Sequence, residues 1–250
     1  MATAFQAPSG APRRWVVAAI VAPSLLAWAL LWWAGASPSR RWFEHDHLAG
    51  GATAVPLVLL GWVVMTAAMM LPTTAPLVGT FRTVVGARPH HRRLIGLLIA
   101  GYIVVWTLVG CFAIVADAVL HAVLPSPAEG ERPWVMVVVL VLAGTYQFTP
   151  LKRKCLTSCR SPFLFVSQHW RGASASWESF QMGVSHGWFC VGCCWTLMVV
   201  MFAVGMGSLG WMLLLAALMA VEKNVARAAF LSPVLGVALF GAASWLAAGV

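Results

Sequence analysis

The stretch "QMGVSHGWFCVGCCWTLMVVMFAVGMGSLGWMLLLAALMAV", residues 181–221, contains no Asp, Glu, Lys or Arg. A helix needs about 20 apolar residues to cross the hydrocarbon core of a bilayer, with a range of about 17–25. We therefore expect two membrane spans here, at 184–204 and 208–221, the second of them short. Three cysteines and a methionine lie within "CVGCCWTLM", although a span requires no sulfur.

The whole chain has the composition of a membrane protein. Its 250 residues are 61% hydrophobic and 9% charged, with a mean hydropathy of +0.85. A soluble domain carries about 25% charged residues. The chain contains 14 Trp and 2 Tyr. Trp is enriched at the headgroup boundary of membranes, so this count also favours a membrane protein. We predict an all-α, polytopic transmembrane helix bundle, with a tail at 1–14 and one integral membrane domain at 15–250.

Apolar runs and basic loops together predict the topology. Seven candidate spans appear, of which the fourth and sixth are short: 15–35, 54–71, 94–116, 134–148, 184–204, 208–221 and 228–248. Of the 16 Lys and Arg, 13 fall in loops on one side and 3 on the other. Because cytoplasmic loops are enriched in Lys and Arg, this predicts a cytoplasmic N-terminus. It also explains the net charge of +9 without nucleic-acid binding. Six spans are the alternative, if the short sixth helix does not cross.

One face of the fifth span carries most of the sulfur. Consecutive residues of a helix lie 100° apart around its axis. At this spacing, one face about 120° wide carries Met182, His186, Cys190, Cys193 and Cys194. Met201 falls on the same face, and Met198 at its edge. Thiolate, thioether and imidazole suit Cu(I), and thiolate with imidazole also suits Zn(II). Packing is the alternative, because Cys and Met commonly fill membrane and protein cores.

Two other sulfur clusters fall in the same predicted cytoplasmic half. In "CLTSCR", Cys155 and Cys159 follow the basic "LKRK" within the expected cytoplasmic loop at 151–183. Cytoplasmic thiols stay reduced, which favours metal or redox chemistry, although two surface cysteines would look the same. In "MTAAMMLP", Met65 and Met69 share a helix face and Met70 points about 100° away.

Two groups of charged residues are also candidates. Glu222 and Lys223 end the sixth span, and an acid at membrane depth usually marks a pathway or a partner. A helix-end pair that snorkels to the interface is the alternative, and we favour it for Lys223. On the outer side, His and carboxylate side chains could bind Cu(II) or Zn(II) or belong to a solvated loop: Glu44, His45, Asp46, His47, Asp117 and His121.

Several motifs together carry a family resemblance. "MTAAMMLPTTAP", "YQFTPLKRKCLTSCRSP", "GCCWTLM" and "EKN" occur in this order between residues 61 and 224. The chain resembles a bacterial family of predicted metal-binding integral membrane proteins, classed as a domain of unknown function, some of whose members are labelled copper chaperones. The resemblance implies a multi-pass inner-membrane protein with a metal site. Its signature positions are Met65, Met69, Met70, Pro72, Cys155, Cys159, Cys193, Cys194, Glu222 and Lys223, whereas His186 and Cys190 come from the helical wheel.

The expected function is therefore binding of copper, as Cu(I), and its delivery to a membrane metalloprotein. Zinc is the alternative metal, and the partners are membrane lipid, the metalloprotein and a soluble metal donor. We expect Cys190, Cys193 and Cys194 to hold the metal tightly and Cys155 with Cys159 to exchange it. A thiol–disulfide electron-transfer protein and a structural subunit of a membrane complex stay open. No P-loop or catalytic triad is visible, so an enzyme is disfavoured.

Overall fold

The computed structural model describes residues 13–36, 55–123, 132–204, 208–225 and 230–249. These residues form helices without any strand, which confirms the all-α prediction. The elements are α1 (Arg13–Ala36), α2 (Val55–Met69), η3 (Leu71–Thr74), α3 (Ala75–Val85), α4 (His91–Val123), α5 (Arg132–Gln147), α6 (Pro150–Arg160), α7 (Pro162–His169), α8 (Ala175–Val204), α9 (Leu209–Asn224) and α10 (Leu231–Ala248).

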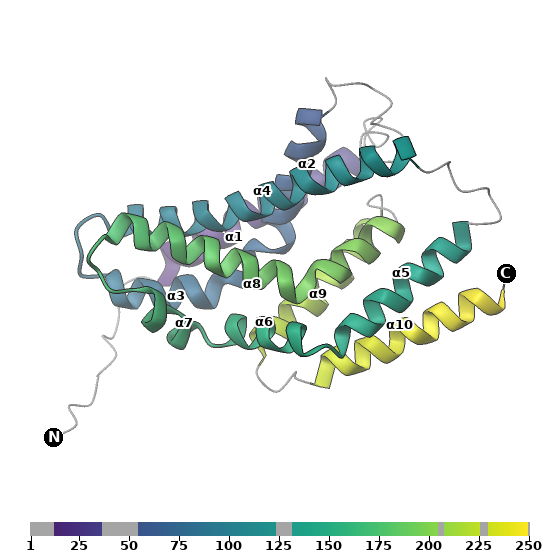
Figure 1. Cartoon of the computed structure of the whole chain (residues 1–250). Helices are drawn as coiled ribbons and strands as arrows, with labels where there is room; N and C mark the ends of the chain where they lie inside the picture. Colours follow the sequence, from purple (N-terminus) through teal and green to yellow (C-terminus); the bar gives the residue numbers. More distant parts are fainter. Residues whose placement is uncertain (1–12, 37–54, 124–131, 205–207, 226–229, 250) are drawn as a thin grey trace.

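Two helix pairs frame the molecule. The long helices α4 and α8 run side by side, and the shorter α5 and α10 form a second pair (Figure 1). Two glycines bring α4 and α8 together, because a Cβ on Gly183 would lie 2.0 Å from the Leu98 carbonyl oxygen and one on Gly101 would lie 2.3 Å from that of Phe180. The close approach fixes α8 as the central helix, with α6 and α9 packed on it.

Two proline-marked breaks direct chain segments toward the middle of α8. Helix α2 stops at Met69 and the chain turns by 47° into η3 and α3, with Pro72 in the break. Helix α5 stops at Gln147 and the chain turns by 63° into α6, which begins at Pro150. Proline lacks an N–H and restricts the residue before it, so helices stop there. The breaks bring Met70 and one face of α6, which carries the buried Lys152, Cys155 and Leu156, to the core.

The structure contradicts seven spans. Four described helices are long and apolar enough to cross a membrane, namely α1, α4, α8 and α10, and the number rises to six if each bent pair is one span. The expected sixth span, 208–221, is part of α9, which has only 16 residues. Helices α2 and α5, with 15 and 16 residues, reach spanning length only together with their bent continuations. Four to six candidate spans are compatible with membrane association.

The connection expected at 151–183 is mostly helical. It contains α6, α7 and the start of α8. In α7, Phe165 and Val166 are buried whereas Phe163 is 75% exposed. The turn before α8 is fixed by Glu178, whose carboxylate accepts hydrogen bonds of 2.6–3.0 Å from the backbone N–H groups of residues 171–174.

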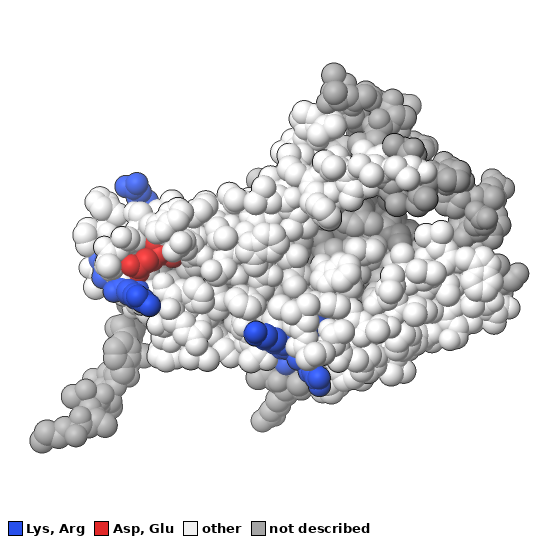
Figure 2. All heavy atoms as spheres, viewed as in Figure 1, with Lys and Arg blue, Asp and Glu red and all other residues white. Residues whose placement is uncertain are grey.

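Charge is confined to two parts of the visible surface. In Figure 2, Lys and Arg side chains lie at the end formed by α3 and α7 and beside α6, and the long faces between them carry none. Large apolar side chains are exposed along the helices, including Phe112 at 75% and Trp245 at 79%. An uncharged face with exposed aromatic residues is what lipid contact requires.

Candidate metal centre

Three sulfur atoms surround one buried ammonium at the centre of the molecule. Cys190 and Cys194 lie one turn apart on α8, Met70 lies in the break after α2, and Lys223 comes from the last turn of α9. The Lys223 Nζ atom is 3.0 Å from Cys190 Sγ, 3.5 Å from Met70 Sδ and 3.6 Å from Cys194 Sγ. Cys194 Sγ is itself 4.0 Å from Met70 Sδ. We call Met70, Cys190 and Cys194 the lysine-facing group.

This group is enclosed by protein. Cys190, Cys194 and Met70 are 0% exposed, and Lys223 is 3% exposed. The Tyr102 hydroxyl of α4 lies 3.0 Å from Cys190 Sγ and donates to the Met70 carbonyl oxygen at 3.3 Å. One phenol therefore joins α4 to both the α8 thiol and the broken end of α2.

A second set of thiols lies between α8 and α6. Cys193 points to a different side of α8 from Cys194 and lies near Cys159 of α6, while its thiol donates to the Cys190 carbonyl oxygen at 3.1 Å. Cys155 packs directly on Gly192, since a Cβ there would lie 2.7 Å from Cys155 Sγ. We call Cys155, Cys159 and Cys193 the α6-facing group. All six cysteines of the chain are free thiols.

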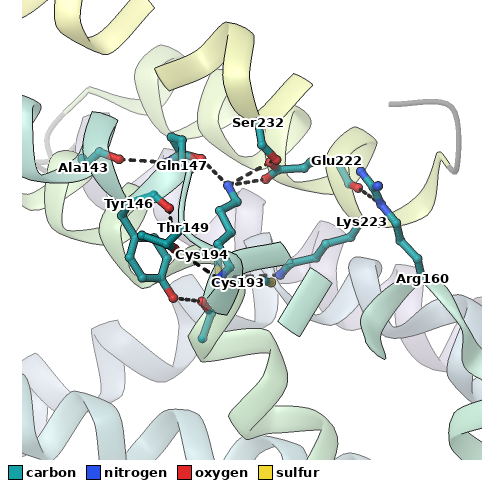
Figure 3. Close-up of polar contacts among 12 residues, drawn as sticks. Ala143, Tyr146, Gln147, Thr149, Arg160, Cys193, Cys194, Glu222, Lys223 and Ser232 are labelled. Atoms are coloured by element: carbon teal, nitrogen blue, oxygen red, sulfur yellow. Dashed lines mark hydrogen bonds and ion pairs between the residues drawn. The ribbon is translucent and has the colours of Figure 1, made fainter. Parts of the chain in front are cut away.

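Glu222 belongs to a different network from its neighbour Lys223. Its carboxylate is 2.8 and 3.0 Å from Lys152 Nζ, and both side chains are buried. Lys152 also donates to the Gln147 side-chain oxygen, and the Ser232 hydroxyl donates to Glu222. In Figure 3, Glu222 extends toward Gln147 and Ser232, whereas Lys223 extends toward Cys194.

Two interpretations of these charges are therefore wrong. Glu222 and Lys223 are 2% and 3% exposed, so neither snorkels to an interface and they do not pair with each other. Lys152 is 0% exposed, so it is not a surface residue, although it belongs to the basic "LKRK" run. Within "LKRK", only Arg153 and Lys154 are exposed basic side chains. Glu222 of α9 instead holds α6 in place through its ion pair with Lys152. Its carbonyl oxygen also accepts a 2.8 Å hydrogen bond from Arg160 Nε of α6.

The other predicted ligands lie in the core around these groups. His186 is buried between the rings of Tyr102 and Phe165, and its Nδ1 has no hydrogen-bond partner in the described part of the chain. Met65 and Met69 are buried in the same apolar core as the thiols, but Met70 is the methionine whose sulfur touches Cys194 and Lys223. That His186, Met65 and Met69 act as metal ligands stays a prediction. The outer cluster of Glu44, His45, Asp46 and His47 lies outside the described residues, as do the side chains of Asp117 and His121.

The chemistry of the donors limits the metal that fits. Over the described residues, no three side chains drawn from His, Cys, Asp and Glu are placed to hold a metal ion. The lysine-facing group instead offers two thiols and a thioether. Soft thiolate and thioether donors select Cu(I), whereas structural zinc takes four Cys, His or carboxylate ligands. The arrangement can therefore hold a soft monovalent ion.

Sequence reasoning missed three members of this centre. Lys223 and Lys152 were assigned to interface and surface, and Tyr102 was not singled out. The signal for Lys223 was present in "EKN", which is one of the motifs of the family resemblance. Tyr102 is one of only two tyrosines in a chain with 14 Trp. This rarity is a weak indication that its hydroxyl has a specific role.

Comparison with known proteins agrees with the resemblance seen in the motifs. No curated protein and no solved structure matches the chain. A family model does match, and it covers residues 59–246, which include both sulfur groups and the Glu222–Lys152 pair. The chain belongs to this family, PpoB2, which is described as a copper chaperone.

Proposed function

We propose that this protein is an integral membrane copper chaperone that binds Cu(I) at the lysine-facing group and passes it to a membrane metalloprotein. The observation that carries the proposal is the meeting of Met70, Cys190 and Cys194 around one point, at 3.0–3.6 Å from the Lys223 nitrogen. Two separate elements supply these sulfurs. Simple core packing does not require two thiols and a thioether to surround a buried cation.

Copper is the better cargo than zinc for the donors present. Cu(I) is selected by thiolate and thioether ligands, and methionine is not among the usual zinc ligands. A zinc site would also need more His, Cys, Asp or Glu side chains at one point than the described residues bring together. The family description points the same way.

The α6-facing group supplies a route between the surface and the lysine-facing group. Cys159 is partly exposed and contacts Cys193, which is next to Cys194 on α8. Arg153 and Lys154 are exposed on the same short helix, where an acidic soluble donor can dock. We propose that copper is exchanged at Cys155 and Cys159 and held at Cys190 and Cys194.

The location of the protein is proposed as the bacterial inner membrane, with α6 on the cytoplasmic side. The basic residues around α6 support this orientation. An impermeant maleimide should modify Arg153→Cys in inside-out vesicles and not in intact cells. Modification in intact cells would place α6 on the opposite side.

Metal content tests the proposed function directly. Anaerobically purified protein should contain about one copper ion per chain, and Cys190→Ala with Cys194→Ala should remove it while circular dichroism stays unchanged. Cys111→Ala is the matched control, because Cys111 is an exposed thiol apart from both groups. Full copper content in the Cys190/Cys194 variant would refute the site. A folded wild-type protein without metal would favour the structural-subunit alternative.

One contact supports the thiol–disulfide alternative as the second candidate. Cys159 and Cys193 lie near each other across the α6–α8 contact, and a pair of adjacent thiols can be oxidised to a disulfide. Under this alternative the purified protein cycles between dithiol and disulfide without bound metal. Mass spectrometry of alkylated protein, combined with the same copper analysis, separates the two functions.

A further inference from the structure

The surroundings of Lys223 differ from those of the other buried lysine. Lys152 is paired with the Glu222 carboxylate at 2.8 Å. Lys223 is equally enclosed, but the partners of its Nζ atom are sulfur atoms, of which Cys190 Sγ is nearest at 3.0 Å. A buried ammonium is costly unless it is paired and hydrogen-bonded. The sulfurs of the lysine-facing group therefore provide the partners that keep Lys223 inside.

We infer that the Lys223 ammonium occupies the copper position in the metal-free protein and is displaced when Cu(I) binds. The inference rests on the proposed function and adds a step to it. Lys223 Nζ lies between Cys190 Sγ, Cys194 Sγ and Met70 Sδ at 3.0–3.6 Å. Metal–thiolate bonds in zinc sites are about 2.3 Å long, which is shorter than these contacts, so the sulfurs close in around a bound ion and leave no room between them for the nitrogen. The two cations cannot share that position.

The exchange replaces one monovalent cation with another. Copper–sulfur bonds form, the N–H···S hydrogen bonds break, and the ammonium leaves with its protons. Each cysteine that ligates copper binds it as a thiolate, so any thiol proton that it carries passes to solvent as the metal enters, and no electron moves. The centre holds a cation among its sulfurs in both states, so no buried thiolate is left there without a positive partner.

The end of α9 offers the displaced side chain a way out. Lys223 is followed by Asn224 and Val225, which are both exposed, and the helix ends at Asn224. A lysine has a flexible four-carbon stem, and the C-terminus of a helix carries a partial negative charge that favours a nearby cation. Rotation of the Lys223 side chain can therefore move the ammonium to the helix end without moving α9.

The chain's three lysines make a self-controlled experiment. Lys154 is exposed, Lys152 is buried in its ion pair, and Lys223 is buried among the sulfurs. Metal-free protein and protein loaded from a Cu(I)–glutathione complex are treated briefly with an amine-acylating reagent at one pH, and each lysine is quantified by mass spectrometry. We expect copper to increase Lys223 acylation at least tenfold. Lys154 should react in both samples and Lys152 in neither.

The outcomes separate this inference from the proposed function. Bound copper with Lys223 still protected overturns the displacement and leaves copper binding intact, because a lysine that stays buried is a ligand or a bystander. Absence of bound copper overturns both. Lys223→Gln adds a second measurement, since a displaced lysine is not a ligand and the variant should keep about one copper ion per chain. Loss of copper from folded Lys223→Gln would overturn the inference. If that variant does not fold, the acylation of wild-type protein decides.

Discussion

The two sulfur groups share α8 but differ in what covers them. Cys193 and Cys194 are consecutive residues, yet Cys194 faces Met70 and Lys223 whereas Cys193 faces Cys159 of α6. Consecutive helical residues point about 100° apart, so one turn of α8 serves two environments. The lysine-facing group is covered by the Lys223 ammonium of α9. The α6-facing group is covered by the short helix α6, which exposes basic side chains. This difference is the basis for our proposal that the first group holds copper and the second exchanges it.

The burial of the thiols supports the same division. Cys190 and Cys194 are 0% exposed, whereas Cys155 is 7% exposed and Cys159 is partly exposed. Ligand exchange at a metal needs an incoming donor to reach the ion, so the enclosed group should release copper more slowly. The position of α6 then decides whether copper can pass between the two groups.

The largest effect should come from breaking the ion pair that holds α6. Glu222→Gln keeps the shape of the side chain but leaves the Lys152 ammonium buried without its carboxylate. Removal of one partner of a buried pair costs about 3–5 kcal/mol. We expect a loss of that order in the free energy of unfolding in detergent, together with faster maleimide modification of Cys159. Cys190 and Cys194 should stay protected.

A double variant is the control for this loss. Lys152→Met with Glu222→Gln removes both charges and should recover most of the stability, because the cost arises from the unpaired charge. A loss below about 1 kcal/mol in Glu222→Gln, the typical value for an exposed pair, would mean that the pair is solvated. In that case α6 is not held in the way described here.

A smaller effect, on rate alone, should follow from removing the exchange thiols. Cys155→Ser with Cys159→Ser should leave the final copper content nearly intact and slow loading from a Cu(I)–glutathione donor by about tenfold, which corresponds to about 1.4 kcal/mol in the barrier. The measurement compares loading rate with final occupancy, with Cys111→Ser as the matched control. If occupancy collapses, the two groups are one site. If neither quantity changes, these thiols do not take part in transfer.

The sequence predicted the sulfur face of α8 but not its division. The helical period predicted one face, or its edge, for seven residues that are all buried in the structure, although Met182 packs in a different core cluster from the cysteines: Met182, His186, Cys190, Cys193, Cys194, Met198 and Met201. A wheel of about 120° width cannot tell which neighbouring helix covers each edge of a face. Only the tertiary contacts of α6 and α9 separate Cys193 from Cys194.

The errors in the span count and in Lys223 have one cause. Hydropathy assigns a span to each apolar run, but α2, α5 and α9 are too short to be counted alone. Pro72 and Pro150 mark the two breaks in the structure, but a proline in the sequence does not show that the continuing segment turns inward. A lysine at the end of an apparent span was therefore placed at the interface, although the broken end of α2 beside it supplies a buried sulfur partner.

The smallest effect, and the finest test of the comparison, should come from the chain's two tyrosines. The Tyr102 hydroxyl lies 3.0 Å from Cys190 Sγ and the Tyr146 hydroxyl donates to the Gly192 carbonyl oxygen on the α6 side of α8. A hydrogen bond contributes about 0.5–1.5 kcal/mol net, so Tyr102→Phe should weaken Cu(I) binding by about three- to tenfold in competition with a Cu(I) chelator. Tyr146→Phe removes the same atom at the other group and should leave the affinity unchanged. Similar losses in both variants would show that the two groups act as one centre, because a change at either side would then reach the bound ion. No loss in Tyr102→Phe would show that Cys190 does not depend on the phenol once copper replaces the ammonium.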